Sequence, residues 1–268
     1  MASDDRCSME ELKAFGTETI RKMGEEALCF YGRGNPAVKF DADLVTTAEL
    51  HLLECFKTSL QNRFPDHQMF NRGQIIGSDY SHEGNRYLWI FDPLDSVDNF
   101  QTGIPIWGMS IALLENFWPI FGVFYMPATG DLFHASAGGD AFHGKEKIHI
   151  PSQDSVDDES LLLTYSRFHM DYQPRFPGKI RNLGCTAAHV CYVAMGRADG
   201  AVIANVSYTD LAAVRVIIES AGGKIYKMDG SDFFLNEYLD GRRITDHLVV
   251  SSPDSFPAIR DCLTRVDR

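Results

Sequence analysis

Two aspartates three positions apart, directly after an apolar run, are the sharpest candidates for chemistry in this sequence. Asp92 and Asp95 lie in the segment D-P-L-D, which follows the apolar residues 89–91. Pro93 restricts Asp92 to an extended conformation, and the turn that follows is expected to bring Asp95 back beside it. Converging carboxylates repel each other unless a cation lies between them, and hard oxygen ligands suit Mg²⁺. The alternative is an ordinary turn, because Asp-Pro and Asp-Asn are frequent turn formers.

Three further segments carry residues that could act in chemistry or only in local structure. Asp210 stands at the start of a predicted helix, where an aspartate could cap the helix or bind a metal. Gly184 precedes a stretch of small residues whose free helical N–H groups could hold a phosphate or a hydroxyl group, or could simply pack closely. Thr46 and Glu49 form a capping-box pattern that explains both residues without any chemistry.

The elements that must position these residues follow from hydrophobic spacing. Ser8 and Glu11 form a capping box that opens a first helix, and a second helix is expected from near Thr46 until Pro65 stops it. The pattern then changes to strands. The strands are predicted at residues 74–77, 86–91, 108–114, 120–125 and 131–135.

The second half of the chain alternates strands and helices. The polar, acidic stretch 151–160 predicts a seam between an N-terminal half, 1–150, with two long helices and a sheet that carries D-P-L-D, and a C-terminal half, 151–268, that carries Asp210. Strands are expected at 161–165 and 200–204, a helix after Gly184, and a helix at 211–221 that Gly222 ends. The order of elements predicts an α+β layered sandwich.

Composition excludes several classes of protein. The formal net charge of −12, without a basic cluster, argues against nucleic acid as a partner. Six cysteines without a C-x-x-C pair favour reduced thiols in the cytoplasm. The first residues lack the features of a signal peptide. Glu115 and Pro119 interrupt the most apolar stretch, 104–126, which predicts two strands joined by a turn and no membrane span.

The order of four motifs resembles the inositol monophosphatase family. The motifs are D-x-V-T at 43–46, D-P-x-D-x-x-x-N-F at 92–100, G-x-x-A-A at 184–188 and D-x-A-A-x-x-x-I-I-x-x-A-G-G at 210–223, and the resemblance extends over about residues 8–252. It implies a layered α-β-α-β-α sandwich and a dependence on Mg²⁺, which Mn²⁺ could replace. It further implies hydrolysis of a small phosphorylated metabolite such as a sugar, nucleotide or polyol phosphate, and a homodimer.

The resemblance also implies roles for individual residues. Asp92, Asp95 and Asp210 match metal ligands, and the carbonyl group of Leu94 matches a fourth. The positions that would border the phosphate and the substrate are Ser96, Val97, Cys185 and Thr186.

This sequence departs from the family pattern at several of its functional positions. Ser78 replaces a glutamate ligand, and Asp79 beside it is the candidate replacement. Val97 replaces a threonine that helps to orient the attacking water, and a valine has no hydroxyl group. Glu49 replaces the aspartate that works with this threonine, which makes Glu49 the candidate general base. Ile203 stands where members that cleave inositol phosphate often carry a glutamate, and it argues against myo-inositol phosphate as the preferred substrate.

Two hypotheses follow. The first is a working metallophosphatase in which Asp79, Asp92, Asp95 and Asp210 hold cations and Glu49 is the general base. The second is a protein that kept the fold, lost efficient hydrolysis and binds a phosphorylated ligand or a protein partner. The three retained aspartates favour the first hypothesis, whereas Ser78 and Val97 motivate the second.

Overall fold

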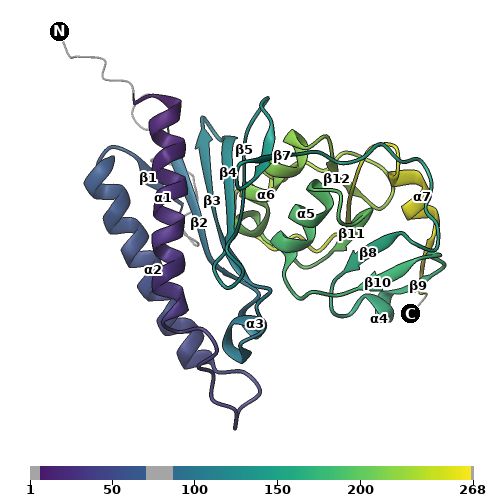
Figure 1. The fold of residues 1–268 in the computed structure, drawn as a ribbon, viewed down its shortest axis with the longest axis horizontal. Coiled ribbons are helices and arrows are strands. Elements are labelled where there is room, and N and C mark those ends of the chain that lie inside the picture. Colours follow the sequence, from purple (N-terminus) through teal and green to yellow (C-terminus); the bar gives the residue numbers. More distant parts are fainter. Residues whose placement is uncertain (1–6, 71–86, 267–268) are drawn as a thin grey trace.

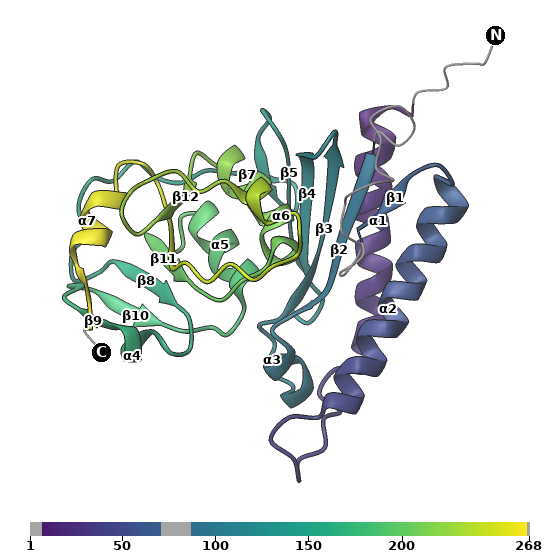
Figure 2. The same ribbon diagram turned by 180° about the vertical axis from the view of Figure 1, so that it is seen from behind.

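Two long antiparallel helices form the first layer of the protein. The computed structural model describes residues 7–70 and 87–266. Helices α1 (Met9–Leu28) and α2 (Ala42–Arg63) lie side by side over one face of the first sheet (Figures 1 and 2). Helix α1 begins at the predicted capping box, in which the side chains of Ser8 and Glu11 each accept a hydrogen bond from the backbone of the other.

Helix α2 begins earlier than the sequence predicted. Its N-cap is Asp41, whose carboxylate accepts a hydrogen bond from the amide of Leu44 at 3.0 Å. Thr46 and Glu49 therefore lie inside the helix, and the prediction that they form a capping box is wrong. The aspartate at 41 already satisfies the first free N–H groups, so the helix can start one turn before Thr46.

The first sheet has seven strands in chain order. They are β1 (Gln68–Met69), β2 (Tyr87–Asp95), β3 (Gly108–Glu115), β4 (Trp118–Met126), β5 (Asp131–Ser136), β6 (Ala141–His143) and β7 (Glu146–Ile148). β1 pairs with β2 in parallel, and the other pairs are antiparallel. The strands predicted at 108–114, 120–125 and 131–135 are confirmed, and β2 covers 86–91 from Tyr87 on. The strand predicted at 74–77 lies outside the described residues.

Two helices fill the space between the first sheet and the second. They are α5 (Thr186–Ala194) and α6 (Tyr208–Ser220). Helix α6 crosses β4 so closely that a Cβ atom added at Gly122 would lie 2.2 Å from the carbonyl oxygen of Ala213. Only glycine permits this approach of strand to helix. Within the described part of the chain, no helix combines the length and the apolar character needed to cross a membrane.

The second sheet has the strand order β10-β8-β11-β13-β12. Its strands are β8 (Leu161–Thr164), β10 (Lys179–Arg181), β11 (Gly200–Ile203), β12 (Lys224–Lys227) and β13 (Leu248–Ser251). The smaller elements are α3 (Val97–Thr102), α4 (Phe168–Asp171), α7 (Phe256–Asp261), η1 (Leu235–Tyr238) and the pair β9 (Tyr172–Pro174) and β14 (Leu263–Arg265).

These elements stack as the predicted layered α-β-α-β-α sandwich, with α1 and α2 at one end and α4 and α7 at the other (Figures 1 and 2). One hydrophobic cluster runs through the middle of it, from Ile90 of β2 through Leu211 of α6 to Val250 of β13. The two sheets therefore share a core through α5 and α6. The division of the chain at residues 151–160 stays a prediction.

Candidate active site

The aspartates of the D-P-L-D segment lie at the end of β2, where the strand is irregular. Asp92 pairs with Ser110 of β3, Asp95 pairs with Gly108, and the register shifts between them. Pro93 lies in this irregular stretch and cannot donate a hydrogen bond to a neighbouring strand. Asp92 is 5% exposed. Ser96, the next residue after Asp95, has a left-handed backbone with φ 78°, so the chain turns sharply after the second aspartate.

The side chain of Asp95 accepts hydrogen bonds from the start of α5. Its Oδ2 atom accepts a hydrogen bond from the amide of Ala187 at 2.5 Å and from the thiol of Cys185 at 3.3 Å, and its Oδ1 atom accepts one from the amide of Thr186 at 3.4 Å. The sequence suggested that these amides could hold a phosphate or a hydroxyl group. In the structure a carboxylate of the same chain binds them.

Asp210 approaches Asp95 from the start of α6. Its Oδ2 atom accepts a hydrogen bond from the amide of Ser207 at 2.8 Å, and its Oδ1 atom accepts one from the Ser207 hydroxyl at 2.7 Å. The N-cap of α6 is thus Ser207, and Asp210 is the third helical residue of a capping box. The helix starts at Tyr208 and not at residue 211, because this box satisfies its first amides.

The charges of Asp95 and Asp210 act on each other. Withdrawal of the Asp95 carboxyl group from water raises its pKa to about 6; the Ala187 amide opposes this shift, and the negative charge of Asp210 adds to it. A second negative charge beside a carboxyl group withdrawn from water is the arrangement that the sequence predicted for a cation site.

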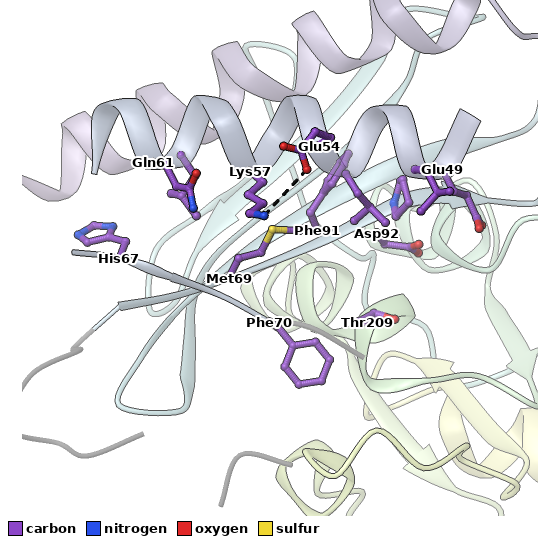
Figure 3. Close-up of a pocket in the computed structure, with 14 residues that line it drawn as sticks. Glu49, Glu54, Lys57, Gln61, His67, Met69, Phe70, Phe91, Asp92 and Thr209 are labelled. Atoms are coloured by element: carbon purple, nitrogen blue, oxygen red, sulfur yellow. Dashed lines mark ion pairs between the residues drawn. The ribbon is translucent and has the colours of Figure 1, made fainter. Parts of the chain in front are cut away.

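A pocket of about 610 Å³ lies between α2 and the end of β2 (Figure 3). Glu49 from α2 and Asp92 from β2 lie at one end of it, and Thr209 of α6 lines it as well. The structure therefore brings the candidate base together with the first aspartate of the motif.

A second pocket, of about 680 Å³, lies beside the N-terminus of α5. Cys185, Thr186 and Ile203 all line it, so three of the residues predicted to border the substrate share one cavity. Because Cys185 and Thr186 also bind Asp95, this pocket adjoins the acidic pair directly.

The remaining candidates pack into the interior beside the site. The side chain of Leu94 is 6% exposed and joins the core beneath α1 and α2, and Val97 packs against the same core. The Oγ atom of Ser96 is buried and makes no hydrogen bond with the described residues. None of these three side chains lines either pocket.

Sequence reasoning missed several residues of the second pocket. Tyr165, Arg167, His189 and His247 line it, yet none belongs to a motif. Tyr165 and His247 are 82 residues apart in the chain, and no local pattern connects them. Motif spacing therefore led to Cys185, Thr186 and Ile203 but gave no signal for these four residues.

The donor chemistry fits a divalent cation, although the acids do not form a ready-made cluster. Within residues 7–70 and 87–266, no group of three His, Cys, Asp or Glu side chains is arranged to hold a metal ion. Ser78 and Asp79 lie outside the described residues. The Asp95–Asp210 pair is the observation that favours a cation here, since a positive charge would offset both the loss of hydration and the repulsion.

Comparison with known proteins settles the family. The model of the inositol monophosphatase family matches residues 8–252. This chain belongs to the inositol monophosphatase family. The fructose-1,6-bisphosphatase/inositol-1-monophosphatase of Thermotoga maritima is 29% identical over 227 residues, which cover 81% of this chain and 85% of that protein. The histidinol-phosphatase of Chlorobaculum parvum is 30% identical over 223 residues, which cover 80% and 84%.

Solved structures of the inositol monophosphatase family share the fold. The Thermotoga maritima IMPase superimposes with a TM-score of 0.76 at 25% sequence identity, over 95% of this chain and 96% of that chain. The predicted fold class and the family resemblance are both confirmed.

Proposed function

We propose that this protein is a Mg²⁺-dependent phosphatase that hydrolyses a small phosphomonoester. The observation that carries the proposal is the placement of two acids from distant segments: Asp95 binds the N-terminus of α5, and the negative charge of Asp210 acts on it from the start of α6. Relatives at about 30% identity are named phosphatases, which supports the same reaction class.

The residues that would hold Mg²⁺, or Mn²⁺ in its place, are Asp92, Asp95, Asp210 and the carbonyl group of Leu94, with Asp79 as a further candidate. A bound divalent cation supplies Lewis-acid chemistry, because it neutralises charge on phosphoryl oxygens and makes water more acidic.

Side chains in the first pocket would accept a proton, and side chains in the second would contact the leaving alcohol. Glu49 lines the first pocket with Asp92 and would accept the proton of the attacking water. Cys185, Thr186 and Ile203 line the second and would border the leaving alcohol. Ile203 offers no hydrogen bond to a ring hydroxyl, so myo-inositol 1-phosphate is expected to be a poor substrate.

The direct test is release of inorganic phosphate from a panel of sugar, nucleotide and inositol phosphates, with Mg²⁺ or Mn²⁺ present. Asp92→Asn is expected to lower kcat by about 100-fold or more. Glu49→Gln is expected to lower kcat by about 100-fold or more as well, as loss of a general base does. Glu54→Gln is the matched control, because Glu54 lies on the same helix and lines the same pocket. Equal activity of the Glu49 and Glu54 variants would remove Glu49 from the mechanism.

The second candidate function is a protein that binds a phosphorylated ligand or a protein partner without efficient turnover. The valine at position 97 favours it, since no hydroxyl group is available there to orient water. Saturable binding of a phosphorylated compound, with no phosphate released at any metal concentration, would support this alternative.

The homodimer implied by the family resemblance is a further proposal. Sedimentation of the purified protein tests it.

A further inference from the structure

Helix α3 follows directly after the D-P-L-D segment and lies beside the start of α2 (Figures 1 and 2). One of its side chains, Gln101, is polar and yet only 5% exposed. Burial of a polar side chain is costly unless hydrogen bonds satisfy it. The partners of Gln101 therefore indicate what this residue does.

These partners lie mainly at the end of the loop that joins α1 to α2. The Oε1 atom of Gln101 accepts a hydrogen bond from the amide of Asp41 at 2.6 Å. Its Nε2 atom donates to the carbonyl oxygen of Lys39 and to Oδ1 of Asp98, both at 3.4 Å. Because Asp41 is the N-cap of α2, the side chain of Gln101 holds the residue at which this helix starts.

The first part of the same loop has its own attachment to α3. Backbone amides at positions 32 and 34 donate to carbonyl oxygens of α3 at 2.9 and 3.0 Å. Among the residues that the structure describes, Gln101 is the only one beyond the loop and α2 that forms a hydrogen bond with residues 39–41. The end of the loop thus depends on this one side chain.

Apolar packing fixes the middle of α2 more firmly than its start. The buried side chains in the first seven residues of the helix are Val45 and Ala48, which are both small. Farther along, Phe56 stacks on Phe91 of β2 with ring centroids 4.7 Å apart. Large buried side chains contribute more to stability than small ones. The hydrogen bonds of Gln101 therefore act at the end of α2 that buries less.

Glu49 lies between these two points of attachment. It is eight residues after Asp41 and seven before Phe56, which corresponds to about 12 Å and about 10 Å along the helix. A displacement of about 2 Å at Asp41, with Phe56 as the pivot, would move Glu49 by about 1 Å. Because Glu49 and Asp92 lie at the same end of the first pocket (Figure 3), this movement would change the distance between them.

We propose that Gln101 is a positioning residue, which sets the place of Glu49 relative to Asp92 by holding the start of α2. The inference rests on the proposed function, because it takes Glu49 as the base that accepts the proton of the attacking water. Gln101 acts only through the helix and contacts no reacting group. A misplacement of about 1 Å at a catalytic group can cost on the order of 100-fold in rate.

Gln101→Met tests the inference, because methionine has a similar length, donates no hydrogen bond and accepts only weakly. With Mg²⁺ and the ester of the panel that is hydrolysed fastest, kcat is expected to fall by about 10-fold or more, while KM changes by less than about twofold. Thr102→Val is the matched control and should leave kcat unchanged. Thr102 lies on the same helix, and its hydroxyl group donates only to carbonyl oxygens within α3.

A double-mutant cycle separates the positioning of Glu49 from a general loss of structure. In the Glu49→Gln background, Gln101→Met is expected to lower kcat by less than about twofold, because the base that it positions is already absent. An equal loss of kcat in both backgrounds would show that Gln101 acts on another group or on the fold as a whole, and it would overturn the inference.

Amide hydrogen exchange tests the same link without turnover. Gln101→Met is expected to speed exchange in residues 42–49 by about 10-fold, and Thr102→Val is expected to leave it unchanged. If the unchanged protein releases no phosphate, the proposed function fails, and faster exchange in the variant still supports the hold of Gln101 on α2. If phosphate is released but Gln101→Met alters neither kcat nor exchange, the proposed function stands and this inference is rejected.

Discussion

The carboxylate of Asp95 lies 2.5 Å from the backbone nitrogen of Ala187, so an acid from the first sheet binds the first turn of the central helix α5. Asp95 thereby joins the end of β2 to the layer that carries Asp210. It has two effects on the protein, since it stabilises a helix start and at the same time brings a negative charge close to Asp210.

Replacement of Asp95 by asparagine separates these two effects. Asp95→Asn is expected to lower phosphate release by about 100-fold or more, because the charge is lost. The variant should melt within a few degrees of the unchanged protein, because the amide oxygen can still accept the hydrogen bond from Ala187. Phosphate release measures the effect of the charge on activity, and thermal unfolding measures the effect of the hydrogen bond on stability. Asp98→Asn, at an exposed position on α3, is the control, and an equal loss of activity in that variant would count against the role of Asp95.

The left-handed backbone of Ser96 predicts a stabilising substitution. Its φ of 78° is costly for a residue with a Cβ atom, and its buried Oγ atom has no hydrogen-bond partner among the described residues. Ser96→Gly is expected to raise the free energy of unfolding by about 1 kcal/mol. Ser96→Ala removes only the oxygen and should gain less. Chemical denaturation measures the free energy of unfolding of the unchanged protein and of the two variants. A destabilised glycine variant would show that the turn is not strained.

His189 predicts how stability depends on pH. It is 3% exposed, and its Nε2 atom accepts a hydrogen bond from the amide of Leu183 at 3.1 Å, so the ring is neutral. Burial lowers its pKa to about 4, from 6.5. Between these values the unfolded chain binds the proton more readily than the folded one. Stability contributed by the neutral ring is therefore present above pH 6.5 and is lost as the pH falls toward 4.

The size of this effect is up to about 3 kcal/mol. Denaturation midpoints measured from pH 7 to pH 4 test it, with His189→Gln expected to flatten the dependence. The control is His169→Gln, at an exposed position on α4. If the slope between pH 7 and pH 4 is the same in the His189 variant, another group is responsible.

Val97 predicts a gain of activity. Valine and threonine have nearly the same shape, and Val97 is only partly buried against the core. Val97→Thr would supply the hydroxyl group that, according to the family resemblance, orients the attacking water. If the proposed function holds, we expect kcat to rise by about threefold to tenfold. The stability cost should be about 1 kcal/mol, since a hydroxyl group enters a partly apolar place. Val97→Ala, which adds no hydroxyl group, must show no such gain.

Much of the fold could be predicted because its strong elements carry local signals. The Ser8–Glu11 box marks the start of α1, Pro65 marks the end of α2, and the apolar runs mark β3, β4 and β5. The start of α2 was missed because two capping patterns compete there, and only the packed structure shows that Asp41 prevails. Strands as short as β6, with three residues, bury too little surface for a pattern to appear.

The candidate site, like the fold, could be predicted only where a local motif marks its residues. Motif order predicted Asp92, Asp95 and Asp210, and the structure places the last two in electrostatic contact. Sequence could not show that the amides of α5 would bind Asp95, since the two segments are about 90 residues apart. Sequence could not show either that Tyr165 and His247 line one pocket, because these residues come together only after the second sheet has formed.

The contact between Gly122 and Ala213 has a consequence for the acids on either side of it. Strand β4 and helix α6 come so close there that no side chain fits at position 122, so this glycine helps to set the interval between the sheet that carries Asp95 and the helix that carries Asp210. Even a single methyl group at position 122 would overlap the backbone of Ala213, so β4 and α6 would have to move apart to accept it.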